Sequence, residues 1–295
     1  MIRRSKGEKV FAVFNYIYLS FLLIVTLYPC LYVVIASVSD PIQLYNGSKL
    51  LLWPRGFNLS GYEYAFTFRQ IWVGYRNTIF YTIGGTALNV VLTIMAAYCL
   101  SRRNLWGQNF IIMCMVFTMY FSGGLIPEYL NIMDLGLGNS LWSLILPVAV
   151  NTTNLIIMKS AFEAIPDSLS ESARLDGASY LQVLVKIMVP LSKATIAVLV
   201  LYYAVAHWNS WFSASIYLRD SSLYPLQLVL RNILTSLEDN TKKSSFAGVG
   251  YDEMARVAEL MKYALIVVAT TPILIFYPFL QKFFVKGVMI GAVKG

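Results

Sequence analysis

Charged residues are scarce in this chain of 295 residues, since Asp, Glu, Lys and Arg make up 13% of it and hydrophobic residues 58%. Soluble domains average about 25% charged residues, so a soluble globule does not fit this composition. The charges are missing entirely from six runs, at 10–39, 77–101, 104–127, 135–158, 194–218 and 263–281. Each run reaches the roughly 20 residues that a helix needs to cross a bilayer. The sequence therefore predicts an all-α membrane protein with six transmembrane helices.

The predicted helices form one transmembrane domain over residues 1–295. They are expected at about 12–38, 77–100, 108–128, 139–161, 194–217 and 263–282. Positive charge marks the inner side of a membrane protein, and Arg102 and Arg103 follow the second span, whereas the loop from 128 to 140 has no Lys or Arg. This places both termini in the cytoplasm, loops 39–74 and 219–261 outside, and loop 162–192 inside. Loop 219–261 is predicted to hold a helix followed by an exposed polar tip, from Glu238 to Ser245.

Other scarcities exclude several classes of function. The six runs contain no acidic residue and only one histidine, His207, so paired carboxylates or a metal cluster for a membrane-embedded hydrolase are not available. No catalytic residue and no metal site is predicted. A secondary transporter or channel that works alone remains an alternative, but its ion coupling would depend on His207. The net charge of +8 lies largely beside membrane spans and points to lipid contact rather than nucleic acid.

The inner loop 162–192 is much longer than two adjacent spans require. Ser168 and Glu171 have the spacing of a capping box, which predicts a helix start, and Gly177 suits the left-handed residue that ends such a helix. A second helix is predicted from apolar residues at positions i, i+3, i+4 and i+7, namely Leu181, Leu184, Val185 and Met188. Pro190 is expected to stop it. The loop therefore predicts a helix, a glycine bend and an amphipathic helix.

Two interpretations of this hairpin are open. It could lie along the membrane surface, or it could dock onto a cytoplasmic partner. The carboxylates of Glu171 and Asp176 are poor partners for an anionic inner leaflet, and this favours docking.

Residues in this loop also match a known family. The residues Glu171, Ala173, Gly177, Ile187 and Pro190 resemble the cytoplasmic EAA loop of ABC importer permeases, with Ser172 and Val189 as mild departures. Asn77-Thr78, Trp208-Asn209 and the tail from Phe284 to Gly295 resemble the MalG-type subunit of carbohydrate importers. The stretch 121–127 resembles a subgroup that imports oligosaccharides derived from complex polysaccharides.

The resemblance implies a type I ABC importer permease fold in the bacterial cytoplasmic membrane, and a transport subunit rather than an enzyme. It also implies three partners: a second, unlike permease, an ATPase homodimer that binds ATP and Mg²⁺, and an extracellular sugar-binding lipoprotein. This chain has no Gly-x-x-x-x-Gly-Lys-Ser/Thr sequence for a nucleotide phosphate, so it is expected to bind no cofactor itself. Glu171 would contact the ATPase, Asp176 and Gly177 would form the bend, and Ala173 and Ala178 would pack closely. The tail residues Lys286, Gly287 and Lys294 would be a second contact.

Polar and aromatic residues inside the spans are candidates for the substrate pathway. They are Asn151, Asn154, His207, Trp208, Asn209 and Trp211. Aromatic rings suit the C–H faces of sugars, and amides both donate and accept hydrogen bonds. The alternative for each residue is a hydrogen bond between helices, which for His207 means a neutral imidazole.

Overall fold

A computed structural model describes residues 6–46, 50–102, 105–247, 258 and 261–275. In these ranges the regular secondary structure is helical, and β structure is limited to one isolated bridge between Ser39 and Phe57. The prediction of an all-α chain is confirmed there. The chain divides into two compact units, one formed by residues 1–68 with 232–271 and the other by 69–231 with 272–295.

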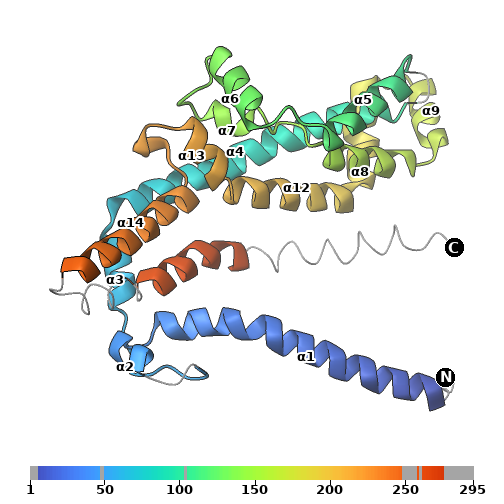
Figure 1. Cartoon of the computed structure of the whole chain (residues 1–295). Helices are drawn as coiled ribbons and strands as arrows, with labels where there is room; N and C mark the ends of the chain where they lie inside the picture. The colour runs from blue at the N-terminus through green and yellow to red at the C-terminus, as the bar shows by residue number, and fades with distance from the viewer. Residues whose placement is uncertain (1–5, 47–49, 103–104, 248–257, 259–260, 276–295) are drawn as a thin grey trace. The chain divides into compact units, whose positions relative to one another are not determined.

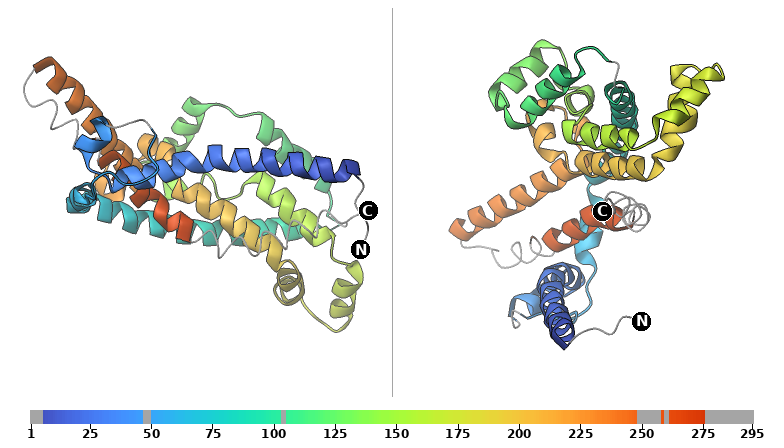
Figure 2. Two further views of the ribbon diagram at one scale, coloured as in Figure 1. Left: turned by 90° about the horizontal axis from the view of Figure 1, so that it is seen from below. Right: turned by 90° about the vertical axis from the view of Figure 1, so that its right-hand side faces the viewer.

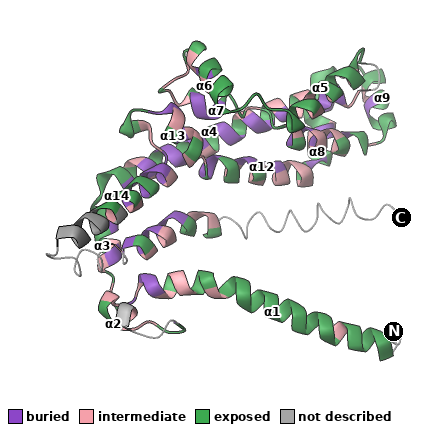
Figure 3. Cartoon of the chain, in the orientation of Figure 1, coloured by how far each residue is buried: buried purple, intermediate pink, exposed green. Residues whose placement is uncertain are grey.

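The first unit is dominated by α1 (Lys6–Ser37), followed by α2 (Pro41–Asn46) and α3 (Ser60–Thr67). Most of α1 is apolar and exposed (Figure 3), as expected for a helix that faces lipid or another subunit. Near the C-terminal end of α1, the ring of Tyr32 meets the ring of Tyr263 edge-on, with centroids 5.9 Å apart. Tyr263 belongs to a further apolar helix, at 261–275.

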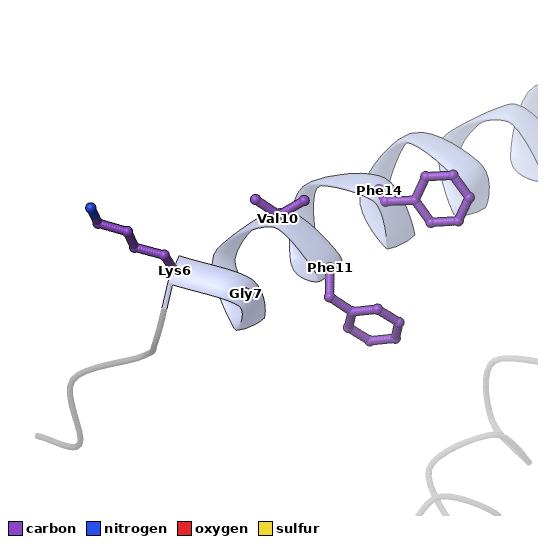
Figure 4. A pocket seen from close by; sticks show the side chains of 5 residues that line it. All are labelled: Lys6, Gly7, Val10, Phe11 and Phe14. Carbon is purple, nitrogen blue, oxygen red and sulfur yellow. The ribbon is translucent and has the colours of Figure 1, made fainter.

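A hollow of about 580 Å³ lies along the first turns of α1 (Figure 4). It is lined by Lys6, Gly7, Val10, Phe11 and Phe14. All five residues come from one helix, and Val10, Phe11 and Phe14 are each at least two-thirds exposed. The hollow is therefore an open stretch of apolar helix surface and not an enclosed binding site.

The second unit is built around α4 (Arg69–Leu100), along which α12 (Lys193–Trp208) and α8 (Thr152–Glu163) pack (Figure 1). Two apolar clusters hold it together. One surrounds the Leu100 end of α4 and includes Met158, Phe162 and Leu199. The other lies toward the Arg69 end and includes Tyr81, Ile132 and Tyr217.

Three predicted spans are not single helices, and this part of the prediction is wrong. The third divides into α5 (Gln108–Tyr120) and α6 (Leu125–Asp134), bent by 117°. Gly124 between them has φ +90°, a conformation that favours glycine. The fourth divides into α7 (Trp142–Ile145) and α8. The fifth divides into α12 and α13 (Trp211–Tyr217), with Asn209 and Ser210 between them.

Two predicted loop boundaries are also corrected. Helix α4 begins at Arg69, inside the predicted loop 39–74. The residues from Arg69 to Arg76 belong to the helix although they carry charges, and the charge-free run did not include them. Helix α14 (Leu226–Ala247) runs through the polar stretch that was predicted to be an exposed tip. Helices α1 and α4 are each long and apolar enough to cross a membrane. Two pairs of helices joined by a sharp bend, at 108–134 and 180–208, reach that length when the two helices of each pair are counted together. The number of six spans stays a prediction, and residues 276–282 of the sixth lie outside the described residues.

Candidate functional site

The predicted hairpin of the inner loop is present, at the Leu100 end of the second unit. It consists of α9 (Asp167–Leu175), a bend, α10 (Tyr180–Val183), the π-helical turn η1 (Leu184–Met188) and α11 (Val189–Leu191). We call residues 167–191 the docking element. Gly177 in the bend has φ +85°, so the predicted left-handed glycine is confirmed. Figure 2 shows α9 at one end of the second unit, beyond the end of α8.

The capping box was predicted at the wrong serine. Helix α9 begins at Asp167 after Pro166, so Ser168 already lies in its first turn and does not cap it. The capping box that forms starts α10 instead. There the Ser179 Oγ accepts a hydrogen bond from the Gln182 N–H at 3.3 Å, and the Ser179 N–H donates to Gln182 Oε1 at 2.7 Å. The bend is thus defined on one side by the conformation of Gly177 and on the other by the capping box that starts α10.

The buried face of the second helix also differs from the prediction. Leu184 and Met188 are buried as expected, but Val183 is the third buried residue, whereas Leu181 and Val185 are exposed. Apolar residues flank Leu184 and Met188 on both sides, so the sequence allowed either neighbouring row to turn inward. The consequence is an apolar surface that no part of the described chain covers.

Pro190 does not stop the helix, contrary to the prediction. It is the second residue of α11, and the chain turns only at Ser192, before α12. The preceding turn is π-helical, with the Val189 N–H bonded to the Leu184 carbonyl. A wider turn of this kind adjusts the backbone near a proline, which has no N–H to donate.

The EAA-like residues divide between the two sides of the docking element. Ala173 and Ala178 are partly buried against the cluster at the Leu100 end, and the Ala178 N–H donates to the Ala173 carbonyl at 2.9 Å. Ile187 packs against the same cluster. Glu171 and Asp176 are exposed, as is Pro190. The small residues therefore hold the element to the helices, and the two carboxylates face outward.

The outward surface of the docking element is apolar as well as acidic. Leu175 is 89% exposed, Leu181 66% and Tyr180 58%. The guanidinium of Arg174 lies 4.6 Å from the centre of the Tyr180 ring. Exposed apolar side chains grouped with charges are typical of a surface that another protein covers.

A second polar site lies between α4 and α12. The His207 side chain is 2% exposed, and its Nε2 atom is 3.2 Å from the Nδ2 atom of Asn89, which is itself fully buried. The same Nδ2 atom donates to the Val148 carbonyl at 3.1 Å, so it is the amide nitrogen that faces His207. The imidazole therefore accepts at Nε2 and carries its proton on Nδ1. His207 thus makes a hydrogen bond between helices, the kind of contact that was the alternative to a substrate contact.

Tyr203 ties the same helices together one turn away. Its hydroxyl is 2.7 Å from the Thr93 hydroxyl of α4 and accepts a hydrogen bond from the Asn151 N–H at 3.0 Å. Asn151 in turn caps α8, because its side-chain oxygen accepts from the Asn154 N–H at 3.1 Å. The Asn151 side chain and the Asn154 backbone N–H are thus engaged in local structure.

The other pathway candidates are not brought together into one site. Trp208 is buried, and the exposed Asn209 donates from Nδ2 to the Val205 carbonyl of its own helix at 2.9 Å. Trp211 stacks under Arg231, whose guanidinium lies 3.8 Å from the ring centre.

At the Arg69 end, three side chains of α4 fix the segment that leads into α14. Asn77 donates from Nδ2 to the Ser222 carbonyl at 2.7 Å and to the Tyr224 carbonyl at 3.1 Å. The next residue, Thr78, accepts from the Leu226 N–H at 2.8 Å, and Tyr81 donates to the Leu223 carbonyl at 2.8 Å. These bonds give Asn77 and Thr78 a structural role at this end of α4.

Asn139 and Asp220 hold the start of that segment. Asn139, with φ +53°, accepts from the backbone N–H groups of Arg219 and Asp220, each at 2.9 Å. The Ser222 N–H donates to Asp220 Oδ1 at 2.8 Å, and this hydrogen bond lowers the pKa of Asp220. A carboxyl with a lowered folded pKa stabilises the fold above its unfolded pKa, and that contribution is lost as the pH falls through the folded value.

We expect Asn77→Ala to lower the stability of the chain by about 1–3 kcal/mol, because two backbone carbonyls lose their donor in a buried place. Thermal unfolding of the detergent-solubilised protein measures this. Asn209→Ala is the matched control, since its amide is exposed and bonds only within its own helix, and its melting temperature should stay near the wild-type value. Equal losses in the two variants would contradict the role given to Asn77.

Comparison with known proteins identifies the family. The model of a family described as "Binding-protein-dependent transport system inner membrane component" matches residues 89–290. The chain belongs to this family. It is therefore the permease of an ABC importer, a multi-pass protein of the bacterial cytoplasmic membrane, as the EAA-like loop predicted.

Similar proteins cover almost the whole permease. "Protein LplC" of Bacillus subtilis (strain 168) is 40% identical over 294 residues, which are 100% of this chain and 98% of that protein. The "Polygalacturonan/rhamnogalacturonan transport system permease protein YtcP" of the same strain is 40% identical over 288 residues, which are 98% of this chain and 99% of that protein. A chain in the "Crystal structure of a bacterial ABC transporter involved in the import of the acidic polysaccharide alginate" superposes with a TM-score of 0.85. It is 32% identical and covers 96% of this chain and 100% of its own length.

The permease also contains functional candidates that the sequence analysis missed. Thr82, Thr86, Asn89 and Thr93 follow each other along one face of α4 at intervals of three or four residues. This polar row in an apolar helix could have been found by its helical period. The predicted tail contacts Lys286, Gly287 and Lys294 lie outside the described residues.

Proposed function

We propose that this permease works with a second, unlike permease, an ATPase homodimer and an extracellular sugar-binding lipoprotein to import oligosaccharides. The observation that carries the proposal is the docking element. Its exposed leucines and carboxylates form a surface for a protein partner, and the chain has no phosphate-binding sequence of its own. ATP and Mg²⁺ would bind to the ATPases, whose closure would move the docking element and the helices attached to it.

The proposed topology has six spans with both termini and the docking element in the cytoplasm. Glu171 contacts the ATPase in this arrangement, and the tail with Lys286, Gly287 and Lys294 is a second contact. A face that packs on lipid would keep its leucines but not its outward carboxylates, Glu171 and Asp176, because the inner leaflet is anionic. This supports the protein partner over the membrane surface.

The proposed substrates are oligosaccharides that carry carboxylates. Two of the similar proteins are named for polygalacturonan/rhamnogalacturonan and for the acidic polysaccharide alginate. Both of these are polymers of sugars that bear carboxyl groups. His207 and Asn151 already have protein partners, since Asn89 Nδ2 lies against His207 Nε2 and the Asn151 side-chain oxygen accepts from the Asn154 N–H.

The first test is purification of the tagged permease from its native membranes in a mild detergent, with mass spectrometry of the attached proteins. We expect a second permease in equal amount and two ATPase copies. In vesicles, import of galacturonate oligosaccharides should require ATP inside and persist when ion gradients are removed. Import that follows an ion gradient without ATP would instead establish an autonomous transporter.

A further inference from the structure

Arg102, just beyond the end of α4, has an unusual environment. Its Nε and Nη2 atoms are buried and have no hydrogen-bond partner in the described chain. The guanidinium carbon lies 4.3 Å from the centre of the Tyr98 ring, and this cation–π contact offsets only part of the lost hydration. Buried donors of a charged group normally have acceptors. An acceptor for Arg102 is therefore expected in another state of the transporter.

The acceptor can come from the cavity beside it. This cavity has a volume of about 80 Å³ and lies among the end of α4, the end of α8 and the start of α9. Its lining includes Arg102, Glu163, Asp167 and Ser170, so a cation and two carboxylates share a space that holds only a few water molecules. A small approach of the docking element toward α4 would close it.

Glu163 is the carboxylate that can change partner. In this structure Glu163 accepts from Lys159 Nζ at 2.6 Å, and the Glu163 side chain is 42% exposed. An exposed pair at i and i+4 is weak and is screened by water and salt. Giving up this pair costs little compared with leaving the Arg102 donors unpaired.

We propose that Arg102 is a positioning residue that links α4 to the end of α8, just before the docking element, by taking Glu163 from Lys159. When the ATPases press α9 toward the helices, the Glu163 carboxylate moves into the cavity and accepts from the buried side of Arg102. The movement of the docking element then reaches α4 through the end of α8 and this ion pair. This inference rests on the proposed function, since it needs an ATPase that moves the element.

The test uses the complete complex in vesicles, with galacturonate oligosaccharides as the probe, and measures sugar imported per ATP hydrolysed. We expect Arg102→Gln and Glu163→Gln each to lower this ratio about 10-fold, while the subunits still co-purify. The double variant should be no worse than either single variant, because both remove the same pair. Lys159→Gln is the control. It removes the present partner of Glu163 and should leave the ratio unchanged or higher.

Wild-type import by Arg102→Gln, or losses that multiply in the double variant, would overturn the inference. If Arg102→Gln fails to assemble, the exchanged variant Arg102→Glu with Glu163→Arg decides. Recovered assembly and import support the pair, and continued failure rejects it. A wild-type complex that lacks an ATPase or does not use ATP would instead reject the proposed function, so the two failures can be told apart.

Discussion

Replacing Gly177 by proline is expected to release the ATPases from the permease while the second unit still folds. Gly177 has φ +85°, and its N–H donates to the Arg174 carbonyl at 3.0 Å. Proline holds φ near −65° and has no N–H, so the bend between α9 and α10 cannot keep its shape. The exposed surface around Leu175 and Leu181 would then be divided. Quantifying the ATPase recovered with each tagged permease measures the effect, and we expect recovery near background.

Gly136→Pro is the matched control for this variant. Gly136 also has a positive φ, +70°, its N–H donates to the Met133 carbonyl at 2.9 Å, and a side chain there would meet no atom within 4 Å. It follows α6, away from the docking element, so Gly136→Pro should keep its ATPase. Gly177→Asn should also keep it, because asparagine tolerates the left-handed conformation. Full ATPase recovery with Gly177→Pro would reject the docking role.

The sequence predicted the bend of the docking element better than the helix starts beside it. A glycine between two helical patterns indicates a left-handed residue that ends the first helix, and Gly177 has this conformation. Ser168 with Glu171 and Ser179 with Gln182 both fit the capping-box pattern, and only the second forms one. The choice depends on Pro166, which fixes the chain so that Asp167 is already helical. The spacing of serine and its partner three residues later does not by itself show which of the two capping boxes forms.

The predicted spans failed where the backbone changes direction. Charge-free runs report how apolar a segment is, and that quantity does not change at Gly124 or at Asn209, where the helices break. The breaks did have local signals, a glycine pair at 123–124 and an Asn-Ser pair at 209–210. Each signal is weak by itself, because lipid-facing helices tolerate such residues when neighbouring groups satisfy the backbone.

The polar residues inside the spans show the opposite limitation. The composition marked His207 as the only histidine, but its partner was not predicted, since the polar row that contains Asn89 does not show which distant residue it meets. Asn89 and His207 are 118 positions apart in the chain. Only the packing of α4 on α12 brings them together. The sequence showed that His207 is a polar residue inside a span, whereas its hydrogen-bond partner depends on this long-range contact.

Gly85→Ala tests the packing of α4 on α12 at His207, and we expect it to lower the stability of the protein strongly. A Cβ atom at Gly85 would lie 2.5 Å from the Nε2 atom of His207, and the imidazole is held in place by Asn89. Because the ring cannot withdraw without losing its hydrogen bond, overpacking should cost about 1–3 kcal/mol. The thermal unfolding of the solubilised complex should then shift to a clearly lower temperature.

Gly84→Ala is the neighbouring control. No atom lies within 4 Å of a Cβ at Gly84, and alanine favours a helix over glycine by about 1 kcal/mol, so this variant should be neutral or slightly stabilising. Gly85→Ala combined with His207→Ala should recover much of the lost stability, since the ring is gone and Asn89 keeps its bond to Val148. If the two alanine variants behave alike, α4 and α12 stand farther apart than described. If they differ, His207 is a tightly packed part of the contact between the two helices.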